Sequence, residues 1–110
     1  MIKLIRVVGN SMMPSFRHND LIFITERKKI LINDIVVFDI CVNRFIVKRV
    51  QYISRNFITV KGDNPKLESS ICDSDINKRS VVGTVVIIIR TKMINFLGYK
   101  FLVPTKISLP

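Results

Sequence analysis

The chain has 110 residues, is 48% hydrophobic and contains only 4 Gly and 4 Pro. This size and composition exclude two separate cores and a disordered chain, so we expect a single domain over residues 1–110. The formal net charge of +10 at pH 7 suits a solvated surface, an anionic membrane or a nucleic acid. No basic helical stripe or aromatic-basic motif is present, so no nucleic-acid partner is expected.

Short runs of alternating or continuous β-branched residues predict an all-β fold. In chain order, the predicted strands cover residues 4–8, 21–25, 34–40, 44–51, 56–61 and 81–90. Polar turns separate them, so neighbouring strands can pair as antiparallel hairpins. Residues 62–80 form the longest stretch without strand character, which we expect to be a functional loop. The apolar segment 93–103 predicts a final strand or an interfacial element.

The last third of the chain, residues 77–110, carries six Lys or Arg and no acid. Such a segment suits peripheral contact with an anionic membrane. The longest apolar run, at residues 81–89, is about half the ~20 residues that span a bilayer, and the N-terminus lacks the apolar core of a signal peptide. We therefore expect a cytoplasmic protein or one at the periphery of a membrane.

The potential metal ligands form no recognisable site, so neither a metal nor another cofactor is expected. The two cysteines, Cys41 and Cys72, lack CxxC spacing, and His18 is the sole histidine. Two free thiols in a reducing compartment are the simpler prediction, and a disulfide is the alternative.

Ser11 lies where the first predicted strand breaks into a turn. Such a turn exposes the hydroxyl, Pro14 fixes the local backbone, and Gly9 permits the close approach of another backbone. A serine in a turn is usually only a turn residue, so catalysis requires a partner that accepts its proton. His18 lies in a charged turn and is not expected to serve.

Lys48 is the candidate partner of Ser11. Alternation along residues 44–50 places Lys48 on the face shared by Ile46 and Val50. Burial among apolar neighbours disfavours the charged ammonium, and an uncharged amine can act as a general base. The alternative, with Lys48 on a solvated face, fits this strand equally well.

Four short motifs occur in order along the chain. They read Gly-Asn-Ser-Met-Met-Pro at residues 9–14, Asn-Asp-Ile-Val at 33–36, Lys-Arg-Val at 48–50 and Gly-Asp-Asn-Pro at 62–65. In order and spacing they resemble the boxes of type I signal peptidases and of the wider S24/S26-type superfamily of serine peptidases, which includes the LexA-like repressors. Among these, the chain looks most similar to short relatives such as the protease that matures nickel-type superoxide dismutase.

This resemblance implies both a fold and a mechanism. The fold would be built from coiled antiparallel sheets that form a partly open barrel. Ser11 would be the nucleophile and Lys48 the general base of a serine endopeptidase that cleaves a precursor or leader peptide after small residues. The backbone N–H of Ser11 would donate to the oxyanion. The substrate strand would pair with the edges near residues 7–9 and 45–47.

Three supporting residues, Gly9, Ser70 and Asp73, follow from the same resemblance. Ser70 can orient Lys48 only if the loop is shifted by one residue against the family pattern that aligns Asp73. Some relatives carry an oxyanion-donating serine at the position of Gly9, so a backbone group or water would replace that donor here.

Two other functions remain as alternatives. A self-cleaving LexA-like module would need a scissile segment before Ser11, and the preceding residues contain no Ala-Gly or Cys-Gly pair. A non-catalytic basic module that binds a membrane or nucleic acid would keep the fold without the chemistry. The altered last box permits this second alternative.

Overall fold

The computed structural model describes residues 2–26, 29–41, 44–66 and 75–110. Within these ranges the chain forms strands and one short 3-10 helix. They are β1 (Ile2–Arg6), β2 (Leu21–Thr25), β3 (Ile35–Cys41), β4 (Arg44–Ile53), β5 (Phe57–Lys61), β6 (Asp75–Asn77), η1 (Lys78–Ser80), β7 (Val81–Phe96) and β8 (Tyr99–Ser108).

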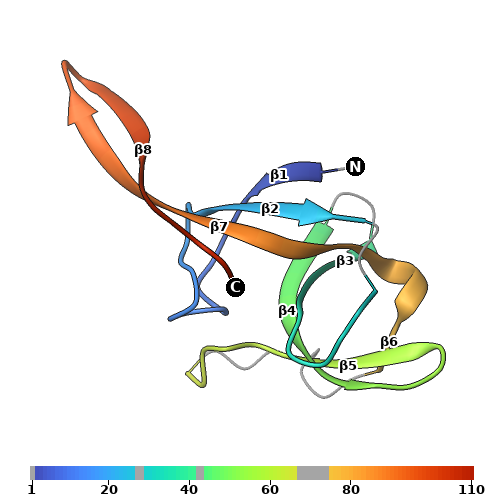
Figure 1. Cartoon of the computed structure of the whole chain (residues 1–110). Helices are drawn as coiled ribbons and strands as arrows, with labels where there is room; N and C mark the ends of the chain where they lie inside the picture. The colour runs from blue at the N-terminus through green and yellow to red at the C-terminus, as the bar shows by residue number, and fades with distance from the viewer. Residues whose placement is uncertain (1, 27–28, 42–43, 67–74) are drawn as a thin grey trace.

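All strand pairs are antiparallel and belong to one eight-stranded sheet, which confirms the all-β prediction. The order is β1-β2-β7-β3-β4-β5-β6, and β8 pairs with β7 outside this path. The sheet curls, as Figure 1 shows, but β1 and β6 at its two ends do not pair within the described residues. The expected partly open barrel is therefore a single open sheet.

The same Asn-Asp turn precedes both β2 and β3. Asn19 and Asn33 each adopt a φ of 74°, in the left-handed region that asparagine tolerates better than most residues. The carboxylates of Asp20 and Asp34 each accept the backbone N–H of the residue three positions earlier, at 2.7 and 2.8 Å. Each turn thus supplies its own hydrogen bonds, and a strand begins at the next residue.

The buried side chains form two clusters that share β3. Alternate residues of β3 point to opposite faces, so Ile35 and Val37 join one cluster and Val36 and Phe38 the other. The first cluster also holds Val7, Met12, Phe16, Ile22, Ile24, Val85 and Ile88, and the second holds Val50, Ile58 and Val60. The first cluster therefore includes residues from the turn that carries Ser11.

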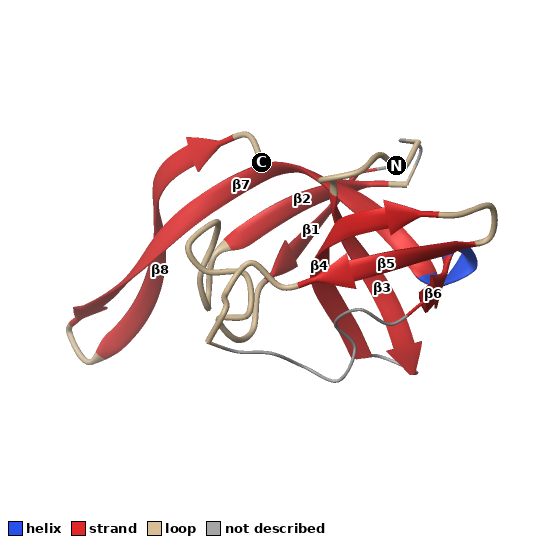
Figure 2. Cartoon of the chain, turned by 90° about the horizontal axis from the view of Figure 1, so that it is seen from below, coloured by secondary structure: helices blue, strands red, loops and turns tan. Residues whose placement is uncertain are grey.

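The predictions for two segments need correction. Residues 75–77 form β6, which pairs with β5, inside the stretch expected to lack strands. The segment 93–103 is not one final strand, because β7 continues to Phe96 and the chain reverses at Leu97 and Gly98 into β8, and its alternative interpretation as an interfacial element stays a prediction. The β7–β8 hairpin projects from the rest of the sheet in both Figure 1 and Figure 2. Among the described residues, no helix has the length and hydropathy to span a membrane.

Candidate active site

The connection between β1 and β2 fixes Ser11 from both sides. Met12 and Phe16 are buried in the first core cluster. Gly9 has a φ of 90°, which favours glycine, and its N–H donates to Nδ1 of His18 at 2.8 Å. The N–H of His18 in turn donates to Oδ1 of Asn10 at 3.0 Å. Core packing on one side and this pair of hydrogen bonds on the other hold the turn, which includes a cis Met13–Pro14 peptide.

Lys48 lies near the middle of β4, directly across from Val36 of β3. It is only 3% exposed, so the prediction that it lies on a buried face is confirmed. No carboxylate of the described residues forms an ion pair with its amine. A lysine buried in this way is rare, because removing an ammonium group from water without a counter-charge is costly.

Gly62, just after β5, lies close to both Ser11 and Lys48. A Cβ atom on Gly62 would lie 2.9 Å from the Ser11 carbonyl oxygen and 3.1 Å from Nζ of Lys48. The neighbouring Asn64 donates its backbone N–H to the same Ser11 carbonyl at 2.9 Å and its side-chain amide to the carbonyl of Asn10 at 2.9 Å. The segment after β5 therefore holds the Ser11 turn against the end of the Lys48 side chain.

Ser11 and Lys48 both line a cleft of about 590 Å³. One wall is formed by residues 5–9, at the end of β1, and the other by residues 45–47 of β4. Among the described strands, β1 pairs only with β2, and β5 pairs with β4 only from Arg49 onward. Both walls thus include strand edges whose backbone groups are not used by a neighbouring strand on the cleft side.

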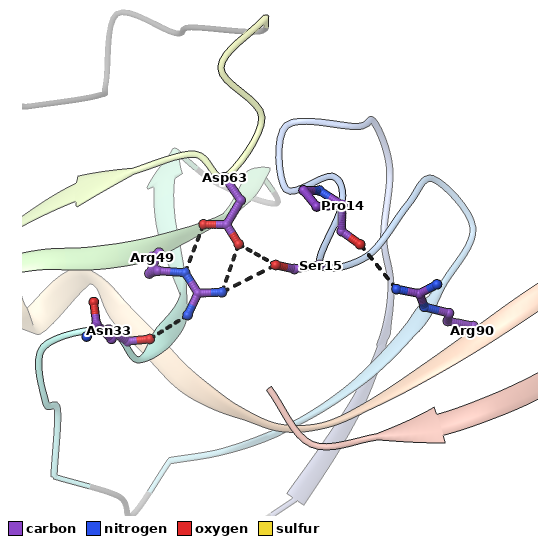
Figure 3. Close-up of polar contacts among 6 residues, drawn as sticks. All are labelled: Pro14, Ser15, Asn33, Arg49, Asp63 and Arg90. Atoms are coloured by element: carbon purple, nitrogen blue, oxygen red, sulfur yellow. Dashed lines mark hydrogen bonds and ion pairs between the residues drawn. The ribbon is translucent and has the colours of Figure 1, made fainter.

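A second polar cluster lies beside this site and joins three of the sequence motifs (Figure 3). Asp63 accepts hydrogen bonds from Arg49, with Nε and Nη2 each at 2.8 Å, and from the Ser15 hydroxyl at 2.5 Å. Arg49 also donates to the carbonyl of Asn33 at 2.8 Å. Because Arg49 follows Lys48 and Asp63 follows Gly62, the ion pair fixes the backbone on either side of the Lys48 amine.

The ion pair shifts the titration of both partners. Burial raises the pKa of Asp63, but hydrogen bonds from Arg49 and Ser15 and the guanidinium charge outweigh it, so the pKa lies below its ordinary value. The hydrogen bond to Asp63 holds the pKa of Arg49 above its ordinary value, against the opposing effect of burial. The pair is therefore charged throughout the neutral range.

The base of the β7–β8 hairpin also contacts the turn that carries Ser11. Arg90 donates to the carbonyl of Pro14 at 3.2 Å, as drawn in Figure 3. Thr91 donates its N–H to Asp20 at 3.1 Å and its hydroxyl to the carbonyl of Asn19 at 2.8 Å. Asp20 is buried, so its carboxylate connects the start of β2 with β7.

The structure brings together Ser11, Lys48 and Gly9 at one cleft. Ser70 and Asp73 lie outside the described residues. The N–H of Gly9 is donated to His18, so this group does not replace the oxyanion donor that some relatives carry at this position.

The sequence reasoning missed the contribution of Arg49, Asp63 and Ser15. All three belong to the four sequence motifs or directly follow one of them. The adjacent Lys-Arg and Gly-Asp pairs could have indicated that Arg49 and Asp63 take part in the site. What the motifs could not give was the partner of each side chain.

A comparison with family models supports the expected relationship. The model of the peptidase S24-like family matches residues 2–86, which span every motif and the strands that line the cleft. No curated protein and no solved structure gave a match. The predicted membership in the superfamily of LexA-like serine peptidases is confirmed, since the matched region covers most of the chain. The chain belongs to the peptidase S24-like family.

Proposed function

We propose that the protein is a serine endopeptidase in which Ser11 is the nucleophile and Lys48 the general base. The observation that carries this proposal is a buried lysine, without a carboxylate partner among the described residues, in the same cleft as a partly exposed serine in a turn. An amine accepts a proton in its uncharged form, so a lysine can act as the base for a serine hydroxyl. The family provides independent support, because its name describes a peptidase.

The reaction follows from these two groups. The Lys48 amine takes the hydroxyl proton as Ser11 Oγ attacks the substrate carbonyl carbon, and the backbone N–H of Ser11 donates to the resulting oxyanion. The ammonium then gives its proton to the leaving amine, which breaks the peptide bond and leaves an acyl ester on Ser11. The neutral amine next activates water to hydrolyse this ester. Arg49 and Asp63 act only as positioning residues, because they hold the backbone on both sides of Lys48.

The substrate would be an extended segment of a precursor or leader peptide. The two walls of the cleft, at residues 5–9 and 45–47, present strand edges that can hydrogen-bond to an added strand. Alternate side chains of such a strand would point toward Met12 and Ile46, which line the cleft. Small side chains at the cleavage site are expected from the resemblance to signal peptidases.

Cleavage of a diverse peptide library, followed by mass spectrometry, tests this proposal without knowledge of the natural substrate. The wild-type protein should produce a consistent set of cut sites, and Ser11→Ala and Lys48→Ala should each produce none above background. Lys48→Arg should also be inactive, because a guanidinium is not a neutral base at usable pH. Lys29→Ala is the matched control, since Lys29 is exposed and outside the cleft.

Circular dichroism would establish that each variant is folded. Cleavage retained in folded Lys48→Ala would exclude the dyad. No cleavage by the wild-type protein, together with an unchanged intact mass after incubation, would instead favour the non-catalytic alternative. A shortened intact mass that is absent in Ser11→Ala would identify self-cleavage.

A further inference from the structure

The β7–β8 hairpin exposes one almost wholly apolar face. Its register pairs Ile94 with Phe101 and Phe96 with Tyr99, and directly paired residues lie on the same face of a sheet. Phe96 is 63% exposed and Tyr99 69%. The rings of Tyr99 and Phe101 lie 6.4 Å apart at a tilted angle of 48°, so the aromatic groups form a continuous surface rather than isolated exposed residues.

The backbone conformation at the tip of the hairpin does not explain why residue 97 is a leucine. Leu97 and Gly98 form the two-residue turn with φ values of 51° and 80°. A turn with positive φ at both positions favours Asn or Gly at the first position, and leucine pays a steric cost there. The Leu97 side chain is nevertheless 81% exposed and packs into no core. An apolar group at a strained and fully projecting position is consistent with a contact outside the chain.

The charge of the hairpin indicates what it contacts. Between Arg90 and Ser108 the chain carries Arg90, Lys92, Lys100 and Lys106 and no acid. Lys100 pairs with Asn95 on the face opposite to the aromatic groups, and both Lys92 and Lys100 are exposed. Apolar groups at the tip with cations behind them complement the acyl boundary and the anionic headgroups of a membrane.

The dimensions of the tip agree with this partner. From Ile94 to Leu97 a strand extends roughly 10 Å, which matches the depth to which interfacial elements enter a bilayer, about 5 to 10 Å. Lys92 would then lie at the level of the headgroups, whereas Lys100, which pairs with Asn95 inside the inserted part, would reach that level only with the end of its side chain. Long lysine side chains can keep their charge in the polar layer while their stems cover apolar surface.

We propose that the β7–β8 hairpin binds the surface of an anionic lipid bilayer, with Ile94, Phe96, Leu97, Tyr99 and Phe101 in the interfacial layer. This inference does not rest on the proposed peptidase activity. It also has a consequence for orientation, since Arg90 and Thr91 connect the base of the hairpin to the Ser11 turn. A bound hairpin would hold the catalytic cleft at a fixed distance from the membrane.

Sedimentation with lipid vesicles tests the proposal. The wild-type protein should bind vesicles of phosphatidylcholine with about one third phosphatidylglycerol, and bind pure phosphatidylcholine far more weakly. Phe96→Ser combined with Leu97→Asn should lower the partition coefficient by about tenfold or more, because it removes two apolar groups from the tip. Asn suits this turn, so the thermal unfolding temperature should not fall. Lys92→Gln and Lys100→Gln should each weaken binding to the anionic vesicles by about fivefold.

Tyr52→Ser is the matched control, because Tyr52 is a highly exposed aromatic residue on β4, outside the hairpin. It should bind like the wild type, and so should Ser11→Ala, which separates membrane binding from peptidase activity. The proposal would be overturned if the wild type failed to bind anionic vesicles, or if the tip variant bound as well as the wild type. If Tyr52→Ser lost as much vesicle binding as the tip variant, the proposal would also be overturned. A dimer in light scattering that the tip variant dissolves, without vesicle binding, would assign the surface to a second copy.

Discussion

Gly62 occupies a position where any side chain would meet both members of the proposed dyad. We predict that Gly62→Ala lowers kcat/KM by about tenfold or more, because its Cβ would lie 2.9 Å from the Ser11 carbonyl oxygen, a backbone atom that cannot rotate away. The free energy of unfolding should fall by only about 1 to 3 kcal/mol, the usual cost of overpacking. Peptide cleavage and urea unfolding would be measured on the same preparation.

Pro65→Ala is the appropriate control for that variant, since Pro65 is exposed in the same segment. Unchanged cleavage in Gly62→Ala would mean that the close approach of the two chain segments is not needed for activity.

The Asp63 carboxylate should make stability depend on pH. Its pKa is lower in the folded protein than in the unfolded chain, so its contribution is complete above about pH 4 and is lost as the pH falls through the folded pKa. We predict that Asp63→Asn lowers the free energy of unfolding by about 2 kcal/mol at pH 7, and that the difference from wild type shrinks below about pH 4. Urea unfolding at several pH values measures this difference, and a gap that stays constant to the lowest pH would contradict the assignment.

Sequence reasoning reached some of these residues and not others for a physical reason. Alternation along a single strand placed Lys48 on one face with Ile46 and Val50, which is a local property, and only the family resemblance favoured the buried face over the solvated one. The contact of Asp63 with Ser15 joins residues 48 positions apart, and no local pattern contains it. Gly62 and Asp63 were visible as a motif, but their partners depended on how β4, β5 and the Ser11 turn pack in space.

At the scale of elements, the Asn-Asp turns before β2 and β3 give a direct test of backbone conformation. At Asn33, φ is 74°, so Asn33→Gly should be neutral within about 0.5 kcal/mol, whereas Asn33→Ala should lower the free energy of unfolding by about 1 kcal/mol. The Asn33 side chain is exposed, so the difference between the two variants reports on the backbone. Equal unfolding free energies for Gly and Ala would show that the turn relaxes without cost.

The element boundaries show the limits of periodicity. β2 was predicted with its observed ends because its continuous apolar run lies between the charged residues Asp20 and Glu26. β6 has only three residues, too few to show a period, and it exists because β5 offers it an edge. The reversal at Leu97 was missed because the sequence there lacks the Asn-Gly signal typical of such turns.

At the scale of the whole molecule, we expect local stability to differ between the centre of the sheet and the projecting hairpin. The first half of β7 pairs with β2 on one side and β3 on the other, and its residues Thr84, Val85 and Ile88 are buried. We expect their amides to exchange with deuterium only through global unfolding, while amides near Leu97 exchange by local opening of the hairpin. Hydrogen exchange followed by mass spectrometry measures both regions at once. Similar protection at the two sites would mean that the hairpin opens only when the sheet unfolds.

The hydrogen bonds of Thr91 to Asn19 and Asp20 also affect when the site can form during synthesis of the chain. The connection between β1 and β2 is synthesised before the residues that hold it, which are residues 49, 63, 64, 90 and 91. A nascent chain that ends before β7 lacks the contacts of Arg90 and Thr91 with this connection, and it lacks the strand that joins β2 to β3. The proposed dyad of Ser11 and Lys48 is therefore expected to be held in its final arrangement only once β7 has been made.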